Sequence, residues 1–151
     1  MSGVEARRVH TALHVLKGAI VSVLGVRKTT SVNVVESYGR LTIAMDRKPT
    51  SEEVSAIEAA ANRKISENAE VLQFEMERAE AEAHFGTLIY DVFPGSGAQI
   101  LTIVRIPDWE VSCCNAEHLE TTGSLGAIRI DGVRLREPNQ ELEIDFQIER
   151  L

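Results

Sequence analysis

The chain has 151 residues, of which 44% are hydrophobic, a size and composition that suit one ordinary domain with its own buried core. Its net charge of −7 argues against nucleic-acid binding through a broad basic surface, and so against a DNA-binding protein. No stretch reaches the roughly 18 apolar residues of a membrane span, and residues 1–8 lack the apolar segment of a signal peptide. We therefore expect a soluble cytoplasmic protein with no membrane partner.

The beginning of the chain predicts a helix followed by a β-hairpin. Apolar residues recur at intervals of three and four over residues 5–24, as on one face of a helix, and Gly25 is a typical C-terminal stop. Apolar and polar residues then alternate over 32–34 and 41–45, on both sides of a turn at 37–39. This alternation is typical of two antiparallel strands with one buried face.

The middle of the chain predicts a second long helix, a strand and a short helix. Thr50 and Glu53 have the spacing of a capping box, which starts a helix. The predicted apolar face of that helix consists of Val54, Ile57, Ala61 and Ile65. Alternation over 72–76 predicts a half-buried strand, and residues 79–85 predict a short helix that ends at Gly86.

The last part of the chain predicts mainly strands. After a loop at 94–97, residues 100–106 are mostly apolar and rich in β-branched side chains, as in a strand covered on both faces. Residues 128–135 and 142–148 alternate and predict another hairpin. The expected fold class is therefore α+β, with a largely antiparallel sheet packed against two main helices in a single domain over residues 1–151.

The only two cysteines, Cys113 and Cys114, are adjacent in the sequence. A strand would point their side chains to opposite faces, so a disulfide between them is not expected. Trp109, Val111 and Cys113 would share one face, and Ser112 and Cys114 the other. We expect Cys113 to pack in the core and Cys114 to be available to a metal ion.

Two residue pairs with the same spacing could together bind one metal ion. His10 and His14 lie four residues apart on the predicted first helix, so both imidazoles project from nearly the same side. Cys114 and His118 repeat this spacing where a strand meets a loop. Three imidazoles and a thiolate favour Zn²⁺ in tetrahedral geometry, although either pair alone is more often an ordinary surface or core pair. The fourth histidine, His84, we expect at the surface or at the end of the short helix.

Both motifs resemble those of a known family. Residues 10–16, H-T-A-L-H-V-L, resemble the H-T-A-x-H-L-L start of the alanyl-tRNA synthetase editing domain. Residues 114–126, C-N-A-E-H-L-E-T-T-G-S-L-G, are similar to its C-G-G-T-H-V-x-x-T-G-E-I-G signature. Asn115, Ala116 and Glu117 depart from that signature, as does Ser124, but no candidate ligand is lost.

The resemblance implies a fold like the editing domains of the threonyl- and alanyl-tRNA synthetases, and a role in translation fidelity. It implies a hydrolase that deacylates mischarged alanine tRNA, chiefly seryl-tRNA(Ala) and to a lesser degree glycyl-tRNA(Ala), with one Zn²⁺ per chain. The short length, with no β-barrel before the first motif, is similar to the short AlaX type of free-standing editing protein.

The resemblance also implies which residues face the substrate. A polar residue about sixteen positions beyond the second histidine faces the pocket in the family, and here that position falls on Thr29, Thr30 or Ser31. A hydroxyl there would recognise serine, although β-branched residues also simply fill strands. Glu117 and Glu120 lie beside the second ligand pair and are candidates for substrate binding or proton transfer.

Two other readings of the sequence remain open. In the first, the chain is a tRNA-binding or partner-binding module whose zinc only holds the first helix to the sheet. In the second, it is a zinc hydrolase of a small ester unrelated to tRNA. A four-ligand site could be a closed structural zinc or a catalytic zinc with one exchangeable position, and the sequence alone is compatible with both.

Overall fold

The computed structural model describes residues 3–90 and 97–149. The predicted loop at 94–97 lies outside the described residues except for Gly97. The helices and strands in chain order are α1 (Gly3–Leu24), β1 (Thr29–Val35), β2 (Tyr38–Ala44), α2 (Ser51–Ser66), β3 (Leu72–Glu77), α3 (Arg78–Phe85), β4 (Ile100–Ile106), β5 (Glu110–Cys113), β6 (Ile128–Arg136) and β7 (Glu141–Ile148). Short 3-10 turns follow α3 and flank β6. Among the described residues, no helix combines the length and apolar composition that a membrane span requires.

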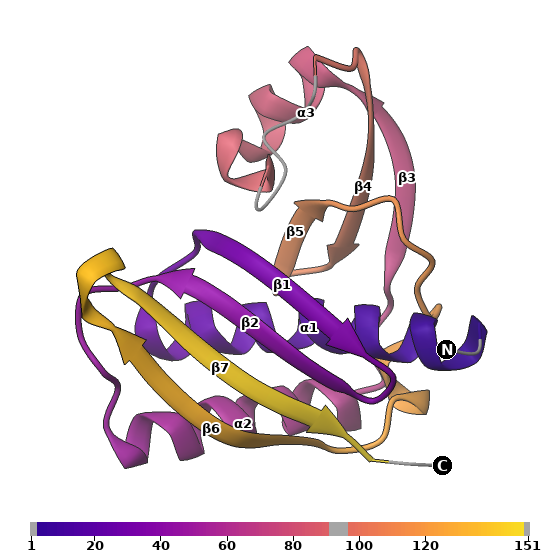
Figure 1. Cartoon of the computed structure of the whole chain (residues 1–151). Coiled ribbons are helices and arrows are strands. Elements are labelled where there is room, and N and C mark those ends of the chain that lie inside the picture. The colour runs from indigo at the N-terminus through magenta and orange to yellow at the C-terminus, as the bar shows by residue number, and fades with distance from the viewer. Residues whose placement is uncertain (1–2, 91–96, 150–151) are drawn as a thin grey trace.

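The strands form two antiparallel sheets, which confirms the predicted α+β class. The larger sheet has the order β1-β2-β7-β6, and the smaller one has the order β3-β4-β5. Figure 1 shows α1 and α2 against one face of the larger sheet, with the smaller sheet and α3 beyond one side of it. The sequence pattern suggested one sheet, because alternation within a strand does not reveal which strands pair with each other.

The main core lies between the larger sheet and the two long helices. Its fully buried side chains include Leu16, Ile20, Leu41, Ile43, Ile57, Ile144 and Phe146. The capping box at the start of α2 is present, since the Glu53 amide donates to Thr50 Oγ1 and the Thr50 amide donates to Glu53 Oε1. On α2 the buried face consists of Ile57, Ala60, Ala61 and Ile65, whereas the predicted Val54 is only half-buried.

Strand β4 is covered on both faces, as its composition predicted. Leu101 and Ile103 face a small cluster beneath α3, while Val104 and Ile106 face the main core. The predicted end of α3 at Gly86 is also confirmed, because Gly86 has a φ of +78° and its amide donates to Glu82. β4 therefore joins the two apolar clusters, and β5 lies beside it at the edge that faces α1.

Two local predictions need correction. The first hairpin turns at Glu36 and Ser37, because Val35 pairs with Tyr38 and the predicted turn residues Tyr38 and Gly39 already belong to β2. Trp109 precedes β5 and does not share a face with Cys113, since it packs on the main core. Its indole N–H donates to the Val15 carbonyl at 2.9 Å, so the ring is held against α1.

Gly18 gives Trp109 the space that it occupies. A Cβ atom at Gly18 would lie 2.1 Å from the Trp109 Nε1 atom. We expect Gly18→Ala to lower the free energy of unfolding by about 1–3 kcal/mol, because a rigid indole must move in a packed core. Chemical denaturation measures this change, with Gly132→Ala as the control. Gly132 has no neighbouring atom within 4 Å of an added Cβ, so an equal loss in both variants would contradict the steric account.

Candidate metal centre and adjoining cavity

Helix α1 and the loop after β5 bring three of the four predicted ligands together. The nearest ligand atoms of His14, Cys114 and His118 all lie within 4.8 Å of one another. His14 comes from the buried side of α1, and the other two come from the segment directly after β5. Residues about 100 positions apart in the chain therefore bring nitrogen and sulfur donors together in a group that could hold a metal ion.

His10 lies one turn before His14 on α1 and next to this group. Its ring centroid is 6.2 Å from that of His118, whereas the centroids of His14 and His118 are 4.8 Å apart. His10 is half-buried and stands at the edge of the three-residue group. The geometry thus gives three close ligands and one imidazole that would have to approach to complete a tetrahedron.

Hydrogen bonds hold the loop of the second motif against α1. Thr11, between the two helix histidines, accepts from the Leu119 amide at 2.9 Å and donates to the Arg7 carbonyl at 2.7 Å. On the other side, Gln73 of β3 donates to the Ala116 carbonyl at 3.0 Å. The threonine of the first motif therefore positions the second motif, a role that spacing alone did not reveal.

We expect Thr11→Val to weaken the site without removing a ligand. The Leu119 amide would lose its acceptor in a part-buried position, which costs about 1–3 kcal/mol. Denaturation of the metal-free protein should show that loss, and titration with zinc should show weaker binding. Thr11→Ser keeps the hydroxyl and serves as the control. If Ser and Val behaved alike, the hydroxyl would have no positioning role.

Both metal-facing histidines are oriented through their Nδ1 atoms. The Nδ1 of His14 lies 2.7 Å from Glu110 Oε2 and 3.2 Å from Ser112 Oγ. The Nδ1 of His118 lies 3.3 Å from Gln73 Oε1, and its Nε2 lies 3.6 Å from Cys114 Sγ. Acceptors on Nδ1 fix the tautomer that leaves the Nε2 lone pair free, as is usual for zinc-binding histidines.

The electrostatics of the group also suit a cation. Burial, together with the charges of His14 and His10, lowers the pKa of His118 to about 3, so this ring is neutral at pH 7. Burial alone would raise the pKa of the Cys114 thiol, but the adjacent His14 lowers it below its ordinary value. Burial alone would lower the pKa of His14, but Glu110 raises it above its ordinary value, so a metal ion has to compete with a proton for this ring. A neutral imidazole and an acidic thiol are the forms that bind divalent metals.

Cys113 points away from this group. Its side chain packs on the small cluster with Val111 and Phe85, and burial raises the pKa of its thiol. Cys114 instead packs beside the main core. The prediction that the two thiols occupy opposite faces is therefore confirmed.

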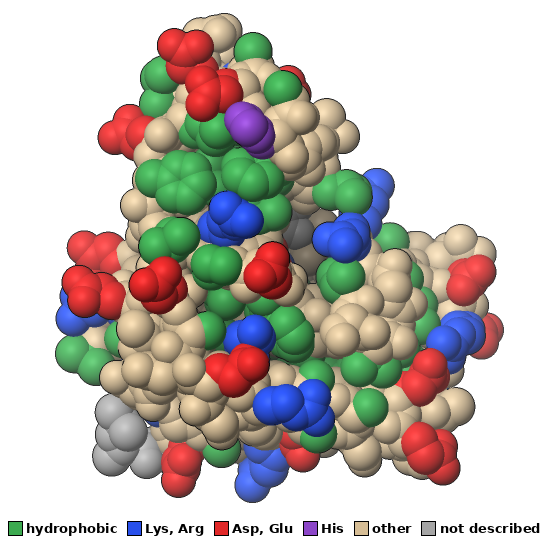
Figure 2. Space-filling view, turned by 180° about the vertical axis from the view of Figure 1, so that it is seen from behind, with side chains coloured by type: hydrophobic (Ala, Val, Ile, Leu, Met, Phe, Trp, Pro, Cys, Tyr) green, Lys and Arg blue, Asp and Glu red, His purple; other side chains and the backbone are tan. Residues whose placement is uncertain are grey.

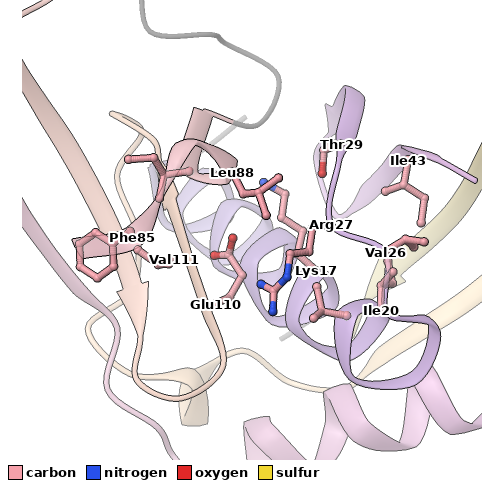
Figure 3. Close-up of a pocket in the computed structure, with 12 residues that line it drawn as sticks. Lys17, Ile20, Val26, Arg27, Thr29, Ile43, Phe85, Leu88, Glu110 and Val111 are labelled. Atoms are coloured by element: carbon pink, nitrogen blue, oxygen red, sulfur yellow. The ribbon is translucent and has the colours of Figure 1, made fainter. Parts of the chain in front are cut away.

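A cavity of about 260 Å³ lies beside the ligand group, between α1, the first hairpin and β5. Its polar lining residues are Lys17, Arg27, Thr29 and Glu110, and its apolar ones include Ile20, Ile43, Leu88 and Val111. Figure 3 shows the Glu110 carboxylate and Thr29 on different walls, with Lys17 and Arg27 between them. Glu110 thus borders the cavity and binds the metal-site residue His14.

The three hydroxyl residues at the start of β1 lie in different surroundings. Thr29 is 2% exposed, lines the cavity, and has an Oγ1 atom without a hydrogen-bond partner in the structure. Thr30 Oγ1 lies 3.4 Å from the Thr42 carbonyl, and Ser31 Oγ lies 3.5 Å from Asn33. Only Thr29 of the three is among the residues that line the cavity.

The candidate carboxylates of the second motif lie outside the cavity lining. The Glu117 side chain is 78% exposed and lies 3.4 Å from Arg7, and Glu120 is exposed. His84 is exposed on α3, as predicted. Sequence analysis missed Glu110, Lys17 and Arg27. For Glu110 a signal existed, because Glu110, Ser112 and Cys114 occupy alternate positions along β5 and the residue that follows it.

The surface carries mixed charge, as expected from the composition. Figure 2 shows Lys and Arg side chains interspersed with Asp and Glu on the face drawn, among hydrophobic side chains. That face presents no broad basic surface. Any contact with a nucleic acid there would have to be local.

Comparison with known proteins relates the chain to one class of enzyme. It is 36% identical over 130 residues to the alanine–tRNA ligase of Thermococcus kodakarensis and 35% identical over 130 residues to that of Pyrococcus abyssi. It is also 36% identical over 127 residues to the alanine–tRNA ligase of Thermofilum pendens. These matches cover 83–84% of this chain but only 14% of each ligase. No family model matches the chain.

Proposed function

On the premise that the chain is homologous to a segment of alanine–tRNA ligases, we propose that it is a trans-editing hydrolase for mischarged alanine tRNA. Its main substrate is seryl-tRNA(Ala), with glycyl-tRNA(Ala) a poorer one. One observation carries this proposal: the His14, Cys114 and His118 group adjoins a cavity lined by Thr29, whose hydroxyl is buried without a hydrogen-bond partner. Residues 1–151 act as one editing unit, in the cytoplasm where tRNA is charged.

We propose zinc as the metal, one ion per chain. The nitrogen and sulfur donors of His14, Cys114 and His118 fit this ion, and their Nδ1 partners leave the correct atoms free. His10 is the fourth ligand in the proposed site, reached by a small movement at the edge of the group. When bound, zinc can polarise a carbonyl or fix the position of a polar substrate group.

Recognition of serine rests on Thr29. Its Oγ1 is buried without a hydrogen-bond partner, and the serine hydroxyl would provide one. The methyl group of correctly attached alanine cannot, and a site built around such a hydrogen bond rejects the analogue without it by as much as about 10⁴. Glycine also lacks the hydroxyl, which is why we place it second.

The cations of the cavity suit the RNA end of the substrate. Arg27 is exposed at the cavity and is followed by the exposed Lys28, while Lys17 lies deeper on α1. Side chains of this kind bind phosphate and ribose oxygens. The local basic edge provides a contact for the 3′ end of tRNA without a broad basic surface.

A second candidate is a binding module in which the metal is only structural. It is favoured by the way in which the ligand group and Thr11 tie α1 to the loop after β5. The two functions differ in one assay. An editing enzyme deacylates seryl-tRNA(Ala) in a metal-dependent reaction, whereas a binding module or a hydrolase of small esters leaves that bond intact.

A further inference from the structure

We infer that Glu110 is a substrate-positioning residue whose carboxylate holds His14 and also receives the α-ammonium group of the aminoacyl ester. The inference rests on the proposed function and adds a recognition element for the amino group. It concerns a residue outside both sequence motifs.

Glu110 lies between His14 and the cavity. It begins β5, its side chain is 9% exposed, and its Oε2 atom lies 2.7 Å from His14 Nδ1. The same residue lines the cavity, and Figure 3 shows its carboxylate directed into that space. A carboxylate has about four acceptor sites, so the contacts with His14 and Ser112 leave capacity for a further donor.

The cavity offers an anion for the cationic group of a seryl ester. Among the described residues that line the cavity, Glu110 is the one acidic side chain. A seryl ester has one cationic group, its α-ammonium, and burying that charge without an anion is costly. With the serine hydroxyl at Thr29, the ester carries its ammonium on the neighbouring carbon, and Glu110 is the anion on the facing wall.

The buried carboxylate of Glu110 has partners within the protein itself. Lys17 also lines the cavity and its charge acts on Glu110, and the Glu110 Oε2 atom lies 2.7 Å from His14 Nδ1. The carboxylate is therefore compensated before the substrate arrives. The α-ammonium group of the ester would then donate to the Glu110 carboxylate, and this contact would hold the ester beside the His14, Cys114 and His118 group.

The experiment compares two esters on the same tRNA, seryl and N-acetylseryl, in single-turnover deacylation. Acetylation removes the positive charge and keeps the hydroxyl and the ester. Wild-type protein should hydrolyse the seryl ester roughly ten- to a hundredfold faster, as expected for loss of a hydrogen bond to a charged group. Equal rates for the two esters would overturn the inference, whatever the variants show.

Glu110→Gln separates the two roles of the residue. The amide oxygen can still accept from His14 Nδ1, so metal content should stay near one equivalent. The seryl rate should fall roughly ten- to a hundredfold, while the N-acetylseryl rate changes little. Glu75→Gln, on an exposed carboxylate of β3, is the control and should change neither rate. A fall of equal size for both esters would leave Glu110 with a purely structural role and overturn the inference.

A binding measurement gives a readout independent of turnover. The probes are 3′-seryl-amide adenosine, which resists hydrolysis, and its analogue without the amino group, titrated by calorimetry. Glu110→Gln should weaken only the first probe, and equal weakening of both would overturn the inference. If wild-type protein deacylated neither ester, the proposed function would fail separately, and this titration would still decide the role of Glu110.

Discussion

Replacing Cys114 with alanine is expected to lower bound zinc from about one equivalent to less than about a tenth. The thiolate is the one sulfur donor of the proposed site, and its loss leaves two close imidazoles with His10 at the edge, a set that we expect to bind zinc more weakly. Deacylation of seryl-tRNA(Ala) should fall with the metal content. Elemental analysis after dialysis measures the first effect, and single-turnover kinetics measures the second.

Cys113→Ala is the matched control for this substitution. Cys113 is the neighbouring residue, but its side chain packs with Val111 on the small cluster. It should keep about one zinc and lose only a modest amount of stability from the smaller side chain. Equal metal loss in both variants would show that the assignment of the thiols is wrong.

Replacing Thr29 with valine should slow deacylation of seryl-tRNA(Ala) by roughly ten- to a hundredfold. Valine keeps the branched shape and removes the hydroxyl of a residue that lines the cavity. The glycyl reaction should slow less, because glycine has no hydroxyl to lose. Single-turnover rates on both substrates measure this difference.

The folded protein should tolerate Thr29→Val well. Thr29 Oγ1 has no hydrogen-bond partner in the structure, so valine removes a buried polar atom without breaking a bond. Metal content should not change, and the free energy of unfolding should stay the same or increase slightly. Thr30→Val is the control, because Thr30 does not line the cavity. If neither variant slowed the serine reaction more than the glycine reaction, selectivity would lie elsewhere, with Ser31 the next residue to change.

Most elements of the fold could be predicted because their signals are local. The apolar stripe of α1 and the capping box at Thr50 and Glu53 depend on residues a few positions apart. The division into two sheets depends on which strands pair, which local alternation does not encode. The position of Trp109 depends on Gly18, 91 positions earlier in the chain, so the face assigned to it from strand alternation was wrong.

The candidate metal ligands could be predicted from the sequence because they belong to two short motifs. The spacing identified His14, Cys114 and His118, but it did not reveal that Thr11 holds the second motif in place. The cavity could not be predicted, because its walls come from α1, β1, β2, β5 and the segment around α3. The alternation of Glu110 with Ser112 and Cys114 was a local signal, but its contact with His14 depends on the packing of β5 against α1.

The most direct test of the account is single-turnover deacylation of seryl-tRNA(Ala) by the protein with and without its metal. The zinc-loaded protein should release serine rapidly and leave alanyl-tRNA(Ala) intact. Protein stripped by a chelator should be inactive and should recover when zinc is added back. Intact seryl-tRNA(Ala) after incubation with zinc-loaded, folded protein would contradict the proposed editing function.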